Sequence, residues 1–136
     1  MATHAKIRCV VVTPEKALLD DLVDFVAIPM YDGELGVLPG RTPLIGKLGF
    51  GELRTTKDDD ISRYYVDGGF VQVRDNIVTL LTSKAVAAKD LSVEAAEQAF
   101  RTTGAAPTPE EQEARLQAQE KARAQLRIID HLRQEE

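Results

Sequence analysis

Few side chains in this 136-residue chain are of the kinds that do covalent or metal chemistry. The two histidines, His4 and His131, lie near its ends, and neither has a nucleophile or metal ligand at a characteristic spacing. Cys9 lies in the apolar run of residues 7–12, which is typical of a buried thiol in a reducing compartment. The sequence also lacks a Gly-rich phosphate loop and a Ser/His/Asp set. We therefore expect a protein that is not an enzyme, with no catalytic residue and no metal site.

Three consecutive carboxylates, Asp58 to Asp60, are the cluster that could suggest a metal site. They have no further ligands at the spacing that a calcium or magnesium site requires. A hairpin turn between two strands is the better interpretation of this run.

Residues 32–44 must have the most constrained backbone, because they read Asp-Gly-Glu-Leu-Gly-Val-Leu-Pro-Gly-Arg-Thr-Pro-Leu. Glycine reaches positive φ without a steric clash and proline fixes φ, so this stretch predicts two tight turns around a very short strand at residues 35–38. Glu34 and Arg41 would then lie on the turns and point outward. A simple chain reversal is the ordinary interpretation of such a cluster.

Short runs rich in Val, Ile, Tyr and Thr fill residues 6–82, and Gly, Pro, Asp or Asn interrupt them at regular intervals. Many short strands at this spacing predict an antiparallel β-sandwich or barrel. The strand at residues 22–30 should be central, because both of its faces are apolar. We expect strands at residues 7–12, 16–20, 22–30, 44–56, 61–66, 70–74 and 77–82.

The periodicity becomes helical after Lys84. Ser92 is a good N-cap for a first helix that runs to about Thr103, and the Gly-Ala-Ala-Pro run at residues 104–107 ends it. Residues 108–111, Thr-Pro-Glu-Glu, supply a cap, a first-turn proline and a capping-box glutamate for a second, longer helix. The C-terminal part of the chain is therefore predicted to be an antiparallel two-helix hairpin.

The longer helix is amphipathic, and its apolar side chains become larger toward the C-terminus. Its second half should overhang the shorter helix, with only alanines at the seam, and the large side chains would rest on the sandwich in a folded-down state. Arg115, Arg123 and Arg127 share an adjacent face, for which an ordinary solvated surface is an equal explanation. The predicted apolar stripe is Ala114, Ala118, Ala122, Leu126, Ile129 and Leu132.

The net charge of −5 argues against nucleic acid as a partner, because phosphate binding requires clustered cations. No run approaches the roughly 20 apolar residues that span a bilayer. We therefore expect a soluble, cytoplasmic protein whose membrane contact comes only through partners. The length suits one compact domain with an appendage, and we divide the chain into a β-sandwich domain at residues 1–88 and a helical domain at residues 89–136.

Several segments closely resemble the epsilon subunit of bacterial F-type ATP synthases. They are residues 33–44, residues 68–73 (Gly-Gly-Phe-Val-Gln-Val) with 76–80 (Asn-Ile-Val-Thr-Leu), and residues 124–129 (Ala-Gln-Leu-Arg-Ile-Ile), which look like the end of that family's last helix. The resemblance covers nearly the whole chain. It implies a ten-stranded sandwich at the foot of the rotor, against the gamma subunit and the c-ring, and a hairpin that moves between contracted and extended states.

The resemblance implies a non-catalytic rotor subunit that couples the c-ring and gamma to ATP synthesis driven by a proton gradient. Such a subunit lies peripherally at the cytoplasmic face of the bacterial inner membrane. Its extended helix restrains ATP hydrolysis by wedging between gamma and the alpha and beta subunits. The partner-binding residues would be Glu34, Leu35, Gly36 and Arg41, where many members have histidine in place of Arg41. The regulatory residues would be Arg115, Arg123, Leu126, Arg127 and Ile129.

Nucleotide binding is the property in which this chain departs from the family. Members that bind ATP on the hairpin carry Ile/Leu-Asp-x-x-Arg-Ala, but residues 91–96 here read Leu-Ser-Val-Glu-Ala-Ala. Ser92 and Ala95 replace the aspartate and the arginine, so a triphosphate loses its charge-assisted partner. We expect no cofactor and no ATP on the hairpin. The alternative, a free-standing nucleotide-binding regulatory module, would require micromolar ATP binding by the isolated chain.

Overall fold

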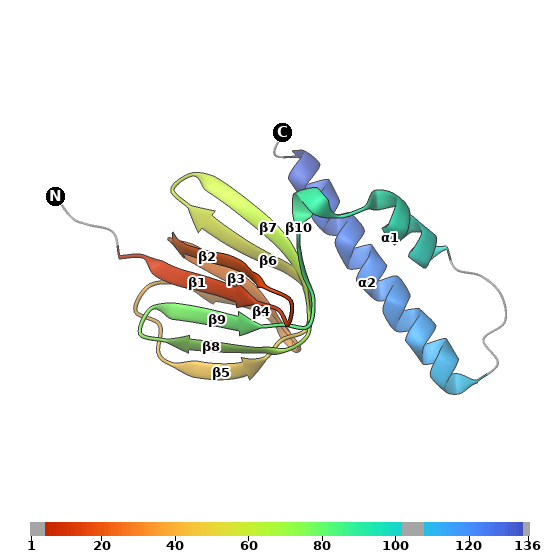
Figure 1. Cartoon of the computed structure of the whole chain (residues 1–136), viewed down its shortest axis with the longest axis horizontal. Helices are drawn as coiled ribbons and strands as arrows, with labels where there is room; N and C mark the ends of the chain where they lie inside the picture. Colours follow the sequence, from red (N-terminus) through yellow and green to blue (C-terminus); the bar gives the residue numbers. More distant parts are fainter. Residues whose placement is uncertain (1–4, 102–107, 135–136) are drawn as a thin grey trace.

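The computed structural model describes residues 5–101 and 108–134. Ten strands form a sandwich of two five-stranded sheets, and two helices extend from one end of it (Figure 1). The predicted sandwich followed by a two-helix unit is therefore confirmed. The strands are β1 (Ile7–Val12), β2 (Ala17–Val23), β3 (Phe25–Met30), β4 (Gly33–Val37), β5 (Leu44–Lys47), β6 (Phe50–Lys57), β7 (Asp60–Asp67), β8 (Phe70–Arg74), β9 (Ile77–Leu81) and β10 (Ala85–Ala87).

The first sheet has the strand order β2-β1-β9-β8-β5, and the second has the order β10-β7-β6-β3-β4. The sheets are antiparallel, as predicted, with one exception: β1 and β9 run parallel, with Arg8 opposite Ile77. The other described strand pairs are antiparallel. The parallel pair lets the N-terminal strand enter the middle of its sheet, where both of its edges are hydrogen-bonded.

The core lies between the two sheets and follows the alternation of the strands. In β1 the predicted inward residues Ile7, Cys9 and Val11 are fully buried, while Arg8 between them is exposed. The strand predicted to be central corresponds to β3, which lies between β6 and β4, and it buries Val26 to Pro29 in succession. Residues of both faces of β3 are therefore buried, as the sequence predicts.

Two predicted strands are wrong because each is divided between the two sheets. The apolar run at residues 22–30 contains the end of β2 and all of β3, with Asp24 between them, and residues 44–56 contain β5 and most of β6. The second crossing is tight, since a Cβ atom on Gly49 would lie 2.8 Å from the carbonyl oxygen of Met30. Apolar residues on both sides of each crossing hide it from the sequence pattern.

The predicted turns are confirmed by the backbone. Asp58 and Asp59 form the hairpin between β6 and β7, and Asp58 has a positive φ of 54°. Asp75 and Asn76 join β8 to β9 with φ values of 52° and 60°, as a two-residue hairpin loop requires. The short strand in the turn-rich stretch is β4, which begins at Gly33 rather than Leu35.

The helical part consists of a single 3-10 turn, η1 (Ala88–Asp90), and the helices α1 (Val93–Phe100) and α2 (Pro109–Gln134). Both predicted caps are present: Ser92 Oγ accepts a hydrogen bond from Ala95 N, and Thr108 Oγ1 accepts one from Glu111 N, each at 3.1 Å. α1 ends at Phe100, and the predicted end at Thr103 with the Gly-Ala-Ala-Pro run lies outside the described residues. Whether the sandwich and the helices are separate domains, divided after residue 88, stays a prediction.

The predicted overhang of the hairpin is wrong, because the first half of α2, and not its second half, extends beyond α1. Figure 1 shows the eight residues of α1 beside the half of α2 that is closer to the sandwich. Ala122 in that half is buried, whereas Ala114 and Ala118 in the first half are exposed. The reason is that α1 starts beside the sandwich and is only about 12 Å long, so it ends before it reaches the first half of α2.

Gly69 should be the glycine of the sandwich that tolerates a side chain least. Its φ is 106°, and a Cβ atom there would overlap the carbonyl oxygen of Leu81 and lie 2.8 Å from Thr82 Cα. Gly68 is a matched control, because its φ is 74° and a Cβ atom would meet nothing within 4 Å. We expect Gly69→Ala to cost at least about 3 kcal/mol of unfolding free energy in urea titrations, and Gly68→Ala about 1 kcal/mol. Equal losses would contradict this packing.

Candidate functional site

The C-terminal half of α2 docks on the end of the sandwich through a small apolar cluster. Ile128 of α2 is 1% exposed and packs with Tyr65 of β7 and Ala88 of η1. Four partly buried residues surround this cluster: Phe50, Leu91, Ala124 and Leu132. Burial of an isoleucine side chain contributes about 1.5–3 kcal/mol, so a few side chains decide where this helix rests.

Two of the residues predicted to rest on the sandwich face the first helix instead. Leu126 and Ile129 line a hollow with Val93 and Glu97 of α1. Ile128, which is not among the residues predicted to rest on the sandwich, packs there instead. Successive residues of an α-helix point about 100° apart, so Ile128 and Ile129 reach different neighbours. Of the predicted large residues, Leu132 does pack at the sandwich.

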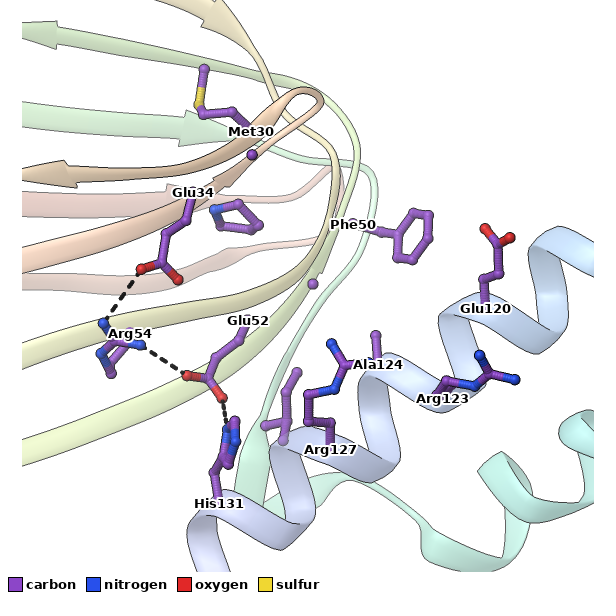
Figure 2. A pocket seen from close by; sticks show the side chains of 14 residues that line it. Met30, Glu34, Phe50, Glu52, Arg54, Glu120, Arg123, Ala124, Arg127 and His131 are labelled. Atoms are coloured by element: carbon purple, nitrogen blue, oxygen red, sulfur yellow. Dashed lines mark hydrogen bonds and ion pairs between the residues drawn. The ribbon is translucent and has the colours of Figure 1, made fainter.

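A groove of about 540 Å³ lies beside the apolar cluster, between α2 and the strands β3, β4 and β6 (Figure 2). Its sheet side carries Glu34, Glu52 and Arg54, and its helix side carries charged residues at a spacing of three and four. Those helix residues are Glu120, Arg123, Arg127 and His131. The groove is therefore lined by both signs of charge and is not a simple anion or cation site.

Glu52 is the polar centre of the docking site. Its Oε1 accepts from Arg63 Nη1 at 2.6 Å and from Arg54 Nη1 at 3.4 Å, and its Oε2 lies 2.9 Å from His131 Nδ1. The side chains of Glu52 and Arg63 are only 13% and 12% exposed. Paired, part-buried charges of this kind fix a geometry more than they add stability. Glu52 therefore defines where the end of α2 sits on the sheet.

A second ionic contact lies at the other side of the apolar cluster. Lys121 Nζ is 3.1 Å from Asp67 Oδ2 at the end of β7, and it lies 5.9 Å from the centre of the Phe50 ring. A cation over an aromatic face contributes about 0.5–1 kcal/mol when it is partly exposed. The docked half of α2 is thus held by charge pairs on both sides of Ile128.

Tyr65 is the docking residue whose hydroxyl group is buried without a well-aligned hydrogen-bond partner among the described residues. The residue is 1% exposed, and burial, followed by the charge of Asp67, raises the pKa of its phenol. The side chains of Gln125 and Asp67 lie close enough to act on that pKa, but neither makes a hydrogen bond of good geometry with the hydroxyl. A buried hydroxyl without a partner opposes burial, so the interface that hides Tyr65 is weaker than its apolar area suggests.

The predicted partner-binding residues are separated by the structure. The prediction that Glu34 lies on a turn is wrong. Glu34 lies in β4, because the pairing of β4 with β3 continues to Gly33. Arg41 is exposed and follows the opposite end of β4. Its backbone N–H donates a hydrogen bond to the carbonyl of Leu38, which closes the turn between these residues. Leu35 packs against the sandwich core, and a Cβ atom on Gly36 would lie 3.1 Å from the Phe25 ring.

The three predicted arginines are also divided. Arg123 and Arg127 line the groove beside the sandwich, whereas Arg115 lies in the first half of α2 and is not part of the groove lining. Glu52, Arg54, Arg63 and His131 are site residues that the sequence analysis did not identify. His131 is 79 positions from Glu52, and no local pattern could connect them.

The chain is similar to one family of known proteins over most of its length. Residues 6–88 match the family described as "ATP synthase, Delta/Epsilon chain, beta-sandwich domain". An ATP synthase epsilon chain of Rhodopirellula baltica is 48% identical over 123 residues, which are 89% of this chain and 96% of the relative. The epsilon chain of Rubrobacter xylanophilus is 34% identical over 128 residues, which are 91% of this chain and 87% of the relative.

Two solved structures have a similar fold. One is the Tetrahymena thermophila mitochondrial ATP synthase central stalk and c-ring, with a TM-score of 0.70 and 16% identity over 94% of this chain and 99% of the matched chain. The other is the Euglena gracilis mitochondrial ATP synthase, with a TM-score of 0.63 and 22% identity over 95% and 80%. Within the described residues, no helix has the length and apolar character needed to cross a membrane.

Ile128 should control the docking of α2. We expect Ile128→Ala to weaken docking by about 2–5 kcal/mol, because it empties a fully buried site. Leu116→Ala is the matched control, since Leu116 is on the same helix and 59% exposed, and it should change docking by less than about 0.5 kcal/mol. Hydrogen exchange of the α2 amides measures the difference, and equal protection in the two variants would show that Ile128 is not the anchor.

Proposed function

We propose a function from one premise: this chain belongs to the family of ATP synthase epsilon chains. It is a non-catalytic subunit of the central stalk that couples the c-ring and the gamma subunit to ATP synthesis driven by a proton gradient. It lies peripherally at the cytoplasmic face of a bacterial inner membrane. Its last helix restrains ATP hydrolysis when it leaves the sandwich and meets the alpha and beta subunits.

The observation that carries this proposal is an apolar outer face on the sheet that contains β1. On this face Phe70 lies directly opposite Leu81, and Ile45 lies opposite Gln72, the next outward residue of β8 after Phe70. Arg8 and Arg74 flank Ile77 on its two sides. Ile45 is 79% exposed, and exposed large apolar side chains set among polar ones on one face of a sheet are typical of a surface that binds a partner. The five exposed members are Leu22, Ile45, Phe70, Ile77 and Leu81. We assign this face to the gamma subunit.

The c-ring contact is assigned to the two ends of β4. Glu34 at one end and Arg41 beyond the other are both exposed charges, and exposed charges suit the polar loops of a ring better than they suit the fold. Leu35 and Gly36 hold the strand between them against the sandwich. These residues are therefore proposed to set the position of the sandwich on the ring.

The regulatory role is assigned to α2 in two states. The docked arrangement is the contracted state, in which Ile128 covers Tyr65 and the groove holds Arg123 and Arg127 beside the sheet. After release, Arg115, Arg123 and Arg127 with Leu126 and Ile129 would present a basic and apolar surface to an acidic segment of the catalytic subunits. The small docking cluster supports this proposal, because a helix held by few side chains can leave.

Nucleotide binding is not part of the proposed function. The side chain of Ser92, at the position of the motif aspartate, is already engaged as the helix cap, and the first turn of α1 contains Glu94 rather than an arginine. A negative charge in this turn opposes a triphosphate. These features favour a rotor subunit over a free-standing nucleotide module.

The gamma interface can be tested on its own. The double variant Ile45→Glu and Phe70→Glu should weaken binding to purified gamma by more than about tenfold, because each glutamate would lose its hydration in the interface. Ile61→Glu is the control, since Ile61 is an exposed apolar residue of the other sheet. Thermal unfolding should be nearly unchanged in both. Full gamma binding by the double variant would refute the assignment of this face.

The helical part can be tested by truncation. Cutting the chain after Lys89 should leave a folded sandwich that assembles with gamma and the c-ring, because all ten strands precede the cut. ATP hydrolysis by the assembled complex should rise. Reversal of Arg115, Arg123 and Arg127 to glutamate should give the same rise, since attraction to an acidic partner becomes repulsion. Hydrolysis that stays unchanged in both complexes would exclude an inhibitory helix.

A further inference from the structure

A chain of charge contacts connects the exposed end of β4 to the last helix. Glu34 Oε1 lies 3.5 Å from Arg54 Nη2, and Arg54 Nη1 lies 3.4 Å from Glu52 Oε1. The other oxygen of Glu52 lies 2.9 Å from His131 Nδ1 on α2. Figure 2 shows the three contacts in sequence across the groove. Arg54 is therefore shared between two carboxylates, and only one of them touches the helix.

The charges on the two sides of the groove indicate that Glu34 favours the docking of α2. On the sheet side the groove is lined by Glu34, Glu52 and Arg54, and Arg63 pairs with Glu52 from outside that lining. The helix side brings Arg123, Arg127 and His131 against Glu120. If Glu34 is neutralised, the sheet side loses one negative charge opposite a mainly cationic helix, which weakens attraction across the groove.

Arg54 amplifies this effect because it can turn from one carboxylate to the other. A guanidinium that has lost Glu34 is left with Glu52, whose Oε1 it already contacts. Glu52, with Arg54 and Arg63 both engaged, then has less negative potential to offer His131. The loss of one exposed carboxylate on β4 is thus transmitted to a contact on α2.

We propose that Glu34 is a remote latch for α2: a cationic side chain that pairs with Glu34 from outside loosens the docked helix. The Glu34 side chain is 56% exposed, so a partner can reach it without moving the sheet. The coupling inside the chain stands without any partner. The identity of the cation donor, a basic group of the c-ring, rests on the proposed function.

The size of the effect follows from exposure. Partly exposed ion pairs contribute little and are screened by salt. We therefore expect the population of undocked helix to increase by about two- to fivefold when Glu34 is neutralised, which is a bias on the equilibrium rather than a complete switch.

The test uses thiol labelling in the full chain. Ala88 is 4% exposed and packs against Ile128, so a thiol introduced by Ala88→Cys reacts with a maleimide only when α2 leaves. Cys9 is an internal control, because it lies in the sandwich core and burial raises the pKa of its thiol to about 12. Its labelling reports opening of the sandwich and not of the helix.

In this background, Glu34→Gln should raise the labelling rate at position 88 by about two- to fivefold and leave the rate at Cys9 unchanged. Asp32→Asn is the matched control: it removes the same charge two residues away, outside the charge chain, and should have no effect. His131→Ala should also raise the rate, and Glu34→Gln should add less in its presence. If Ala88→Cys itself accelerates Cys9 labelling, hydrogen exchange of residues 121–134 in the natural chain replaces it, with the same expectations.

The latch is overturned if His131→Ala accelerates labelling while Glu34→Gln does not, or if Asp32→Asn acts as strongly as Glu34→Gln. The proposed c-ring contact is tested separately, by assembly of the Glu34→Ala and Arg41→Ala double variant with purified c-ring. Normal assembly together with faster labelling would refute the c-ring contact and retain the latch. Weak assembly with unchanged labelling would refute the latch and retain the contact.

Discussion

The docking of Ile128 between Tyr65 and Ala88 is the interaction on which the arrangement of this protein depends. The sandwich builds its own core between two sheets, and that core does not extend to the helices. A separate and smaller cluster joins α2 to the sheet that contains β6 and β7. Because the two clusters are distinct, the helix can separate from the sandwich while the strands remain folded. A two-state element of this kind is what regulation by a moving helix requires.

The polar contacts around Ile128 set the geometry of docking without making it strong. Glu52 satisfies its oxygens with Arg54, Arg63 and His131, while the buried hydroxyl of Tyr65 works against burial. Charge pairs of this exposure contribute little net free energy. The docked state is therefore specific in position and modest in stability. These two properties allow a remote carboxylate to bias it.

Local patterns in the sequence predicted what local physics determines. The alternation in β1, the hairpin at Asp75 and Asn76, and the caps at Ser92 and Thr108 each depend on a few neighbouring residues. The crossings between sheets could not be predicted, because apolar residues continue through Asp24 and Gly49. The resemblance to epsilon chains supplied the family, which the comparisons support, and the roles of Glu34 and Arg41, which remain proposals.

The docking site was predicted only in part, and the reason is geometric. Ile128 and Ile129 are both apolar and adjacent, so the sequence alone cannot tell which faces the sandwich. The centre of the site is Glu52, whose partners lie 11 and 79 positions away. Such contacts depend on where α2 packs on the sandwich, and the burial of Ile128 against Tyr65 and Ala88 sets that position.

The central claim is that α2 is a releasable helix on a sandwich that does not change. The most direct measurement is the distance between two spin labels, one at Gln117→Cys on α2 and one at Asp59→Cys in the β6–β7 hairpin, both exposed positions. If α2 is releasable, the isolated chain gives one distance between the labels. The assembled synthase then contains a second population of molecules, in which the labels are a different distance apart. A single distance, the same in the isolated chain and in every state of the assembled enzyme, would contradict this claim.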